Sequence, residues 1–159
     1  MHRNAWIFAR GGSVRVPRKN VSVVGGKPLI AWAIGQAKAT GLFDRVLVST
    51  DSAEVSEVAR SLGAEVPFTR PSALSGSHSQ EIDAWRHALT WEENEYGYRP
   101  ELFVSVPPTA PLRLPGDIEA CISLLHRERA DIAFTMTPAT SRPNFNMVVW
   151  AATDTLQLL

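Results

Sequence analysis

The stretch Ile7–Asn20, IFARGGSVRVPRKN, begins as an apolar strand and turns into a basic loop with two adjacent glycines. The apolar run Ala5–Ala9 before the glycine pair is typical of a short buried strand. The chain as a whole has no net formal charge, because it contains 16 basic and 16 acidic residues. The loop nevertheless collects four cations, Arg10, Arg15, Arg18 and Lys19. This local concentration of positive charge needs a local explanation.

Strands and helices alternate outward from this stretch. Apolar residues at helical spacing predict helices over residues 27–41, 51–63, 80–97 and 116–129. Short apolar runs predict strands at residues 5–9, 45–50, 64–68, 102–106 and 131–138, with a sixth at 145–150. Single helices between strands predict an α/β fold with a mainly parallel, doubly wound sheet and helices on both faces. The length suits one domain over residues 1–159.

Ligands of such sheets bind at the carboxyl ends of the strands. The loops 10–20, 50–52, 70–79 and 107–113 all follow predicted strands, so we expect them to gather at one edge. The first loop matches neither G-x-G-x-x-G nor a P-loop. Its glycines would let backbone amides approach an anion, and Arg10 and Lys19 would neutralise phosphate charge. The alternative interpretation is a solvated basic turn.

Composition argues against several classes of partner. A neutral chain without a basic stripe and interleaved aromatic residues does not predict nucleic-acid binding. Cys121 is the single cysteine, so no internal disulfide is expected, which fits a reducing compartment. No signal peptide is visible, and no apolar run approaches the roughly 20 residues that span a bilayer. We therefore expect a cytoplasmic protein without a membrane or nucleic-acid partner.

Several motifs occur in an order that resembles one known family. They are RGGS followed by PRKN, then GGKPLIAWAI, GLFDRVLVSTD, GAEVPFTRP and PPTAPLR. Together they resemble the acylneuraminate cytidylyltransferases, or CMP-sialic acid synthetases, whose relatives activate legionaminic and pseudaminic acids. The resemblance covers essentially the whole chain and implies a Rossmann-like nucleotidyltransferase fold. It also implies a reaction in which a nonulosonic acid attacks the α-phosphate of CTP through its anomeric hydroxyl, and pyrophosphate leaves.

The resemblance assigns the phosphate side of this site to the first loop. Arg10 and Lys19 would hold the CTP phosphates and act in catalysis, with Lys19 stabilising charge that develops at the α-phosphate. Ser13 and the backbone amides of Gly11 and Gly12 would complete the phosphate cradle.

Three further residues would form the nucleoside side of the site. By resemblance, Asn20 would contact the ribose or base, and Arg70 in TRPSAL would lie near the cytosine. The alternative for Arg70 is a surface arginine before a proline. Asp51 would position the base side of the site, or it would cap the helix that follows, and the two roles are compatible.

The sugar side would use residues later in the chain. PPTAPLR resembles the segment that borders the acceptor in the family, so Thr109 would donate to the sugar or the nucleotide, and Arg113 would pair with a carboxylate. The alternative is a rigid turn into the next helix. Arg142, Asn144 and Asn146 in SRPNFNMV are further polar candidates.

The chain departs from the family pattern at several positions. Val14 stands where a lysine is usual, Pro107 replaces a common glutamine, and Ser77 replaces an acidic residue. Family members also carry late metal-binding aspartates and a segment that helps form a dimer. We expect that this chain lacks that C-terminal part of the fold, so the ligands of the implied Mg²⁺ would not all lie within it. A homodimer is expected from the resemblance.

Some residues are assigned no role. His78, His87 and His126 are interpreted as solvated, and Cys121 as a small apolar residue of a core helix. The predicted helix 80–97 is expected to turn Ile82, Trp85, Ala88 and Leu89 inward.

Three hypotheses of function remain. The first is an enzyme, a cytidylyltransferase for a nonulosonic acid. The second is a related nucleotidyltransferase that uses another sugar acid or nucleotide. The third is a catalytically impaired CTP-binding remnant, or an assembly partner of a catalytic chain.

Overall fold

A computed structural model describes residues 3–13, 15–136, 148–150 and 156–158. The helices are α1 (Leu29–Ala39), α2 (Ala53–Ser61), α3 (Glu81–Tyr96) and α4 (Pro115–Glu128), with short 3₁₀ turns η1 (Lys19–Val21) and η2 (Ser72–Leu74). The strands are β1 (Asn4–Phe8), β2 (Val23–Val24), β3 (Lys27–Pro28), β4 (Arg45–Ser49), β5 (Val104–Ser105), β6 (Val148–Trp150) and β7 (Leu156–Leu158). All four predicted helices are confirmed, each within two residues at its ends.

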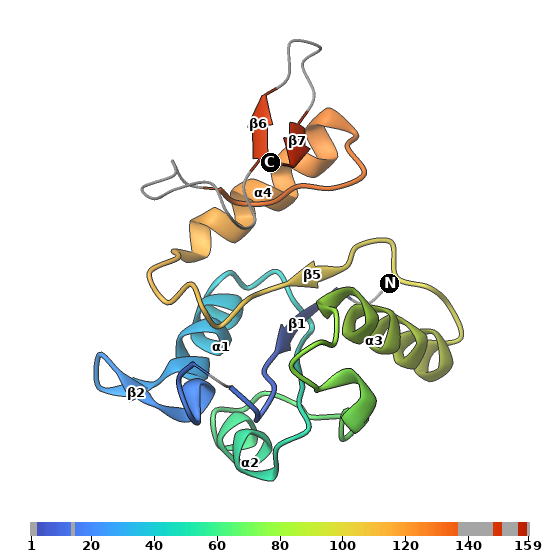
Figure 1. The fold of residues 1–159 in the computed structure, drawn as a ribbon. Helices are drawn as coiled ribbons and strands as arrows, with labels where there is room; N and C mark the ends of the chain where they lie inside the picture. The colour runs from blue at the N-terminus through green and yellow to red at the C-terminus, as the bar shows by residue number, and fades with distance from the viewer. Residues whose placement is uncertain (1–2, 14, 137–147, 151–155, 159) are drawn as a thin grey trace.

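A parallel sheet organises the described chain (Figure 1). β1 lies between β4 and β5, and it pairs with both in parallel, with Ala5 opposite Val46 and Val104. β1 suits the central position because Ala5, Trp6 and Ile7 are fully buried, so that both of its faces are apolar. β2 with β3, and β6 with β7, form separate antiparallel pairs.

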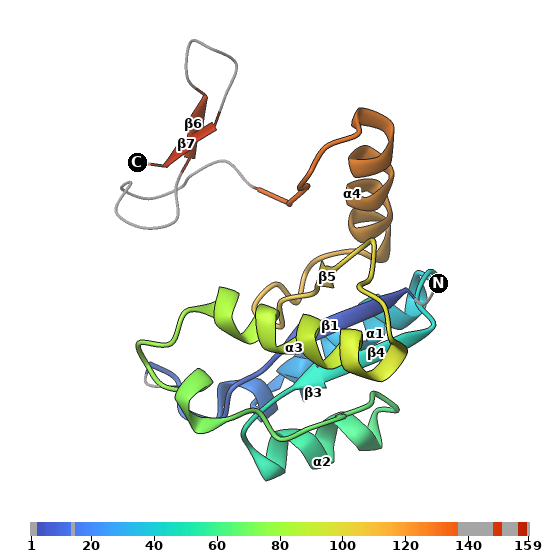
Figure 2. The same cartoon turned by 90° about the vertical axis from the view of Figure 1, so that its right-hand side faces the viewer.

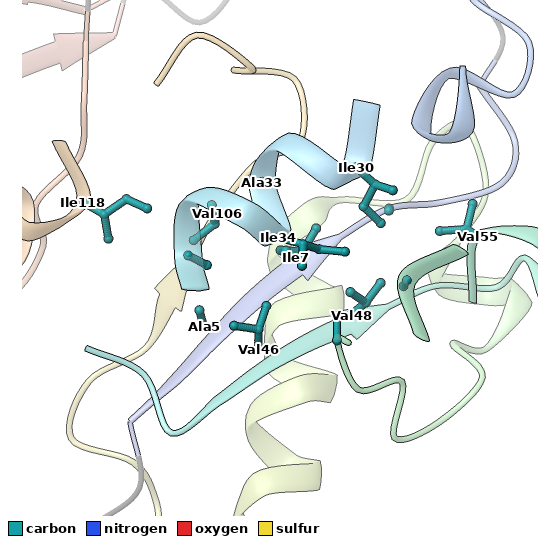
Figure 3. Packing of buried hydrophobic residues seen from close by; sticks show 14 residues of the cluster. Ala5, Ile7, Ile30, Ala33, Ile34, Val46, Val48, Val55, Val106 and Ile118 are labelled. Atoms are coloured by element: carbon teal, nitrogen blue, oxygen red, sulfur yellow. The ribbon is translucent and has the colours of Figure 1, made fainter. Parts of the chain in front are cut away.

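Helices cover both faces of this sheet. On one face, α1 and α2 pack against side chains of β1 and β4 around Ile7, Ile34 and Val48 (Figure 3). On the other face, Trp6 and Leu47 pack against Ala88 of α3, within a group of aromatic rings. The two views of the fold place α1 and α3 on opposite sides of β1 (Figure 2). Successive residues of β1 alternate between the two faces, which explains why a continuous apolar run is needed there.

Two predicted strands differ in the structure. The segment 64–68 forms only isolated parallel bridges, Leu47 with Glu65 and Thr50 with Thr69, although these still align it beside β4. The predicted strand 131–138 is wrong for its described part, residues 131–136, where no strand forms. Ile132, Phe134 and Met136 are exposed there. A strand is stable only when it pairs with a neighbouring strand, and no described residue pairs with residues 131–136.

The buried face of α3 differs from the prediction in part, since Ala88 is buried as expected and Trp85 and Leu89 are half-buried. Ala84, Ala88 and Glu92 are buried, at a spacing of four residues, whereas Ile82 is 39% exposed. The helix is rotated toward the sheet because Glu92 accepts hydrogen bonds from Asn4 Nδ2 (2.6 Å) and Trp6 Nε1 (2.9 Å). Hydrophobic periodicity misses this face because a buried carboxylate is part of it.

An ion pair joins β4 to the neighbouring segment, because Arg45 Nε donates to Glu65 Oε1 at 2.9 Å. This hydrogen bond and the charge of Arg45 hold the pKa of Glu65 below its ordinary value. A carboxyl group with a lowered folded-state pKa stabilises the fold above its unfolded-state pKa, and that contribution is lost as the pH falls through the folded-state pKa.

We therefore expect Glu65→Gln to flatten the acid side of the stability profile. Between about pH 6 and about pH 2, wild-type protein should lose more unfolding free energy than the variant. Urea unfolding at several pH values measures this difference. Parallel profiles for the two proteins would show that the ion pair contributes nothing to the acid response.

Candidate nucleotide-binding site

Three of the expected loops meet at the carboxyl edge of the sheet. Pairing of β1 with β4 continues into the first loop, where Ala9 N–H donates to Ser49 O at 3.1 Å. Arg70 N–H donates to Thr50 O at 2.8 Å and so brings the third loop beside the second. Arg10 Nη1 then donates to Gly76 O at 2.7 Å and links the first loop to the third. The predicted gathering of loops 10–20, 50–52 and 70–79 is confirmed.

Gly11 lies at the closest approach between the first two loops. Its backbone N–H donates to Asp51 Oδ1 at 2.9 Å. A Cβ atom at Gly11 would lie 2.8 Å from Ser52 Cβ, so only glycine fits without a shift of the backbone. Gly12 is different, because a Cβ atom there would meet nothing within 4 Å. Of the two expected glycines, Gly11 is therefore required by space, and its amide already has an acceptor.

The capping role offered for Asp51 is wrong. Ser52 is the N-cap of α2, and its hydroxyl accepts from Val55 N–H at 3.3 Å. Asp51 stands one residue earlier and turns its carboxylate toward Gly11 instead. The sequence offers two adjacent residues that suit an N-cap, and only the position of the first loop decides between them.

Asn20 closes the first loop from within. Its side chain is buried, and Nδ2 donates to Arg10 O at 2.9 Å. Asn20 Oδ1 is buried and has no hydrogen-bond donor among the described residues. The predicted contact with ribose or base stays a prediction, whereas the observed role of Nδ2 is to hold the two ends of the loop together.

The loop cations fall into two groups. Arg18 forms an ion pair with Glu54 of α2, in which Nε donates to Oε2 at 3.1 Å, and Arg10 binds the Gly76 carbonyl. Lys19 is half-buried at the start of η1, and Arg15 is exposed. Within the described part of the chain, neither of these two side chains forms a hydrogen bond or ion pair. Lys19 and Arg15 are therefore the loop cations whose charge is available to an anion.

Arg70 is buried, with 6% of its surface exposed, so the alternative of a surface arginine is wrong. Its Nη2 donates to Ser49 O at 2.6 Å, while Nε has no acceptor among the described residues. Burial lowers the pKa of Arg70 from its ordinary value, and the charges of Asp51 and Glu81 oppose that shift. Arg70 thus ties the start of the third loop to the end of β4.

We expect Arg70→Ala to destabilise the fold by about 1–3 kcal/mol, because it removes a buried, charge-assisted hydrogen bond to Ser49 O and leaves that carbonyl with Ala9 N–H as its described donor. Urea unfolding monitored by tryptophan fluorescence measures the change. Arg60→Ala is a matched control, since Arg60 is exposed and also donates to one carbonyl, Val66 O at 3.0 Å. Equal losses in the two variants would contradict the structural role of burial at Arg70.

The segment PPTAPLR is braced by its own arginine. Arg113 Nη2 donates to Pro107 O at 2.7 Å, and Gln36 Nε2 donates to Pro111 O at 2.9 Å and to Arg113 O. The rigid-turn alternative therefore has direct support. Thr109 is exposed, and no described hydrogen bond joins it or Arg113 to the first loop. Arg142, Asn144 and Asn146 lie outside the described residues, as does Val14.

Sequence reasoning did not identify several residues that contact the first loop. Ser52 and Glu54 contact the first loop, and Gly76 receives Arg10, but none of these contacts leaves a local sequence signal. The solvated interpretation of His87 is wrong, because its ring packs edge-on against Phe68 with centroids 4.5 Å apart. Burial and then the charge of Arg70 lower the pKa of His87.

Two features are absent from the part of the chain that the structure describes. No group of three His, Cys, Asp or Glu side chains among the described residues is placed to hold a metal ion. None of the described helices has the length and apolar character needed to cross a membrane.

Comparison with known proteins gives a consistent result. A family model described as Cytidylyltransferase matches residues 5–144. The chain is 33% identical over 142 residues to post-translational flagellin modification protein B of Campylobacter coli, which covers 89% of this chain and 60% of that protein. It is 45% identical over 83 residues to pseudaminic acid cytidylyltransferase of Campylobacter jejuni, which covers 52% of this chain and 36% of that protein. The chain therefore spans less than two thirds of the length of these relatives.

Solved structures agree on the fold. A CMP:2-keto-3-deoxy-manno-octonic acid synthetase complexed with CTP matches with a TM-score of 0.65 at 22% identity, over 79% of this chain and 48% of that one. A cytidylyltransferase from Leptospira borgpetersenii matches with a TM-score of 0.60 at 18% identity, over 79% of this chain and 49% of that one. The family match over residues 5–144, on a parallel sheet with the glycine loop at its carboxyl edge, shows that the chain belongs to the cytidylyltransferase family.

Proposed function

We propose that this chain carries the nucleotide-binding part of a cytidylyltransferase that uses CTP to activate a nonulosonic acid, giving the CMP-sugar and pyrophosphate. The proposal rests on the first loop, whose backbone is fixed while one of its cations has no described partner. Its backbone is held by Asp51 and Asn20, while the ammonium group of Lys19 has no partner among the described residues. A fixed loop with an unengaged cation at the end of a central strand suits a phosphate group.

The chemistry follows from charge. The anomeric oxygen of the sugar acid forms a bond to the α-phosphorus of CTP, and the bond to the leaving pyrophosphate breaks. Negative charge spreads over the phosphate oxygens during this step, so catalysis depends on positioning and on fixed positive charge. Lys19 would supply that charge at the α-phosphate. Arg10, oriented by the Gly76 carbonyl, would contribute from the opposite end of the loop.

Other loop atoms would complete the nucleotide site. The Ser13 hydroxyl and the backbone N–H of the exposed Gly12 are donors that the described contacts leave for a phosphate, whereas Ser13 N–H donates to Gly11 O. Arg70 would border the cytosine, and Asn20 would contact the ribose or base. Each of these assignments is part of the proposal.

The acceptor is proposed to be a nonulosonic acid. The supporting relatives include the pseudaminic acid cytidylyltransferase and a CMP-N,N'-diacetyllegionaminic acid synthase of Campylobacter jejuni that is 35% identical over 142 residues. Thr109, Arg113, Arg142 and Asn144 remain the candidates for the sugar side. Arg113 would need to keep its contact to Pro107 while its remaining donors face a carboxylate.

Mg²⁺, a homodimer and the doubly wound order of the complete sheet are further parts of the proposal. The described residues do not fit a metal site built by protein ligands alone. Mg²⁺ would enter with the triphosphate, as it commonly binds through phosphate oxygens and few carboxylates.

Pyrophosphate release tests the proposal. The protein would be incubated with CTP, Mg²⁺ and one of a panel of sialic, legionaminic and pseudaminic acids, with UTP, ATP and GTP as nucleotide controls and EDTA as a metal control. Pyrophosphate release with CTP and one of the acids would support the proposed activity and identify the acceptor. Thermal stabilisation by CTP without release would favour the alternative, a CTP-binding partner of a catalytic chain.

A further inference from the structure

Two carboxylates stand beside the proposed triphosphate site. Asp51 immediately precedes the N-cap of α2, and Glu54 lies in its first turn. Negative charges this close to bound phosphates would repel them. Their presence in this position therefore calls for a function that outweighs the repulsion.

Asp51 fixes the beginning of the loop. Its Oδ1 accepts from Gly11 N–H at 2.9 Å, in a part-buried contact. On the same side, Ser52 Cβ limits how closely any residue at position 11 can approach. Gly11 is thus held by a charged acceptor and bounded by a neighbouring side chain, both of which belong to the start of α2.

Glu54 fixes the end of the loop. Arg18 has a left-handed backbone (φ 54°), which is unfavourable for a residue with a side chain. In that conformation its carbonyl accepts from Val21 N–H and Ser22 N–H, each at 3.0 Å, and so starts η1, the turn that carries Lys19. The Arg18 side chain reaches Glu54, so the ion pair holds the residue whose backbone orients Lys19.

Both carboxylates belong to a rigid support. α2 buries Val55 and Ala59 in the same core as β1 and β4. The start of this helix is therefore fixed relative to the sheet, and contacts from it place the loop relative to the sheet as well.

We propose that Asp51 and Glu54 are positioning residues that clamp the two ends of the loop Gly11–Arg18 to α2, and so present Lys19 to the nucleotide phosphates. This inference rests on the proposed function. Asp51 acts through the Gly11 amide and Glu54 acts through Arg18. Neither positioning role requires contact with the nucleotide, because each carboxylate acts through the loop residue that it binds.

The positioning role and simple charge repulsion predict opposite changes in CTP affinity when either carboxylate is removed. If the carboxylates were only nearby negative charges, their removal would strengthen CTP binding, because repulsion is relieved. If they position the loop, their removal weakens CTP binding despite the gain in net positive charge. The sign of the change in affinity therefore separates the two accounts.

The experiment compares Asp51→Ala, Asp51→Asn, Glu54→Ala and Glu57→Ala with wild type. Asparagine at position 51 keeps an oxygen that can accept from Gly11 N–H but removes the charge. Glu57 is the control, because it is an exposed glutamate on the same helix without a described partner. CTP affinity is measured by isothermal titration calorimetry, and circular dichroism verifies that each variant is folded.

We expect Asp51→Ala to weaken CTP binding about tenfold, as loss of a charge-assisted hydrogen bond suggests. Glu54→Ala should weaken it by about threefold, because exposed ion pairs contribute less. Asp51→Asn should stay within about threefold of wild type, since the acceptor remains. Glu57→Ala should bind CTP as tightly as wild type or more tightly.

A second readout needs no nucleotide. Trypsin can cut the loop after the exposed Arg15, and the rate of cutting follows how often the loop opens. Asp51→Ala and Glu54→Ala should be cut faster than wild type and Glu57→Ala at the wild-type rate. Tighter CTP binding by the two alanine variants, or cleavage at the wild-type rate in both, would overturn the clamp. Wild-type protein that binds no CTP would overturn the proposed function instead, and the cleavage rates would still decide on the clamp.

Discussion

Lys19→Ala is expected to lose CTP-dependent pyrophosphate release, with a decrease of about a hundredfold or more. Removing one preorganised group that stabilises transition-state charge commonly has an effect of this size. Lys19 begins η1, beside the buried Asn20 that ties the loop to Arg10, so its ammonium group is attached to a fixed piece of backbone. The loss is measured by quantifying the pyrophosphate released from CTP and the preferred sugar acid in reactions stopped at fixed times.

Lys27→Ala is the matched control for this prediction. Lys27 lies outside the loop, in β3, where its ammonium group sits 3.8 Å from the ring centroid of Trp32. Its removal should leave pyrophosphate release within about threefold of wild type, since a cation–π contact of this kind affects stability by only about 1 kcal/mol. Release by Lys19→Ala at the wild-type rate would contradict the role given to Lys19.

Glu92→Ala is expected to destabilise the fold by about 2–5 kcal/mol, because it removes the acceptor that two buried donors share, and of these two Asn4 Nδ2 alone keeps a second described acceptor, the Tyr96 hydroxyl. Those donors are Asn4 Nδ2 and Trp6 Nε1, both on the central strand β1. Only 1% of the Glu92 surface is exposed, so water does not replace the lost acceptor without a rearrangement. Urea unfolding at neutral pH measures the difference in free energy.

Two controls separate this effect from a general weakening of α3. Glu92→Gln keeps an acceptor of similar shape and should be less destabilising than the alanine variant. Glu93→Ala changes an exposed neighbour and should alter the free energy of unfolding by less than about 0.5 kcal/mol. If Glu92→Ala proved no worse than Glu93→Ala, the buried network would have no energetic role.

Local sequence signals account well for the helices. α2 begins after a serine cap and ends before Gly63, and α3 ends at Gly97 in a left-handed conformation, φ 72°. Such signals act between residues that are near one another in the chain, so they are visible without the fold. The inner face of α3 is not visible in this way, because the hydrogen-bond donors that pair with the buried Glu92 lie on β1, 86 to 88 residues away.

The same distinction between local signals and contacts of distant residues applies to the candidate site. The glycine pair and the cations marked the loop, and strand alternation predicted that four loops would meet at one edge, of which hydrogen bonds join the first three. Which groups engage one another depends on contacts between distant residues, such as Arg18 with Glu54 and Gly11 with Asp51. Sequence patterns therefore located the loop, whereas they did not separate the cations that hold it from those left for a ligand.

The most direct test of this account is the affinity of the protein for CTP, CDP and CMP, measured by isothermal titration calorimetry with Mg²⁺ at two salt concentrations. A loop that presents Lys19 to phosphates predicts that affinity falls from CTP to CDP to CMP, and that added salt weakens CTP binding more than CMP binding. Equal affinity for CTP and CMP would contradict the account, because the loop would then make no use of the phosphate charge.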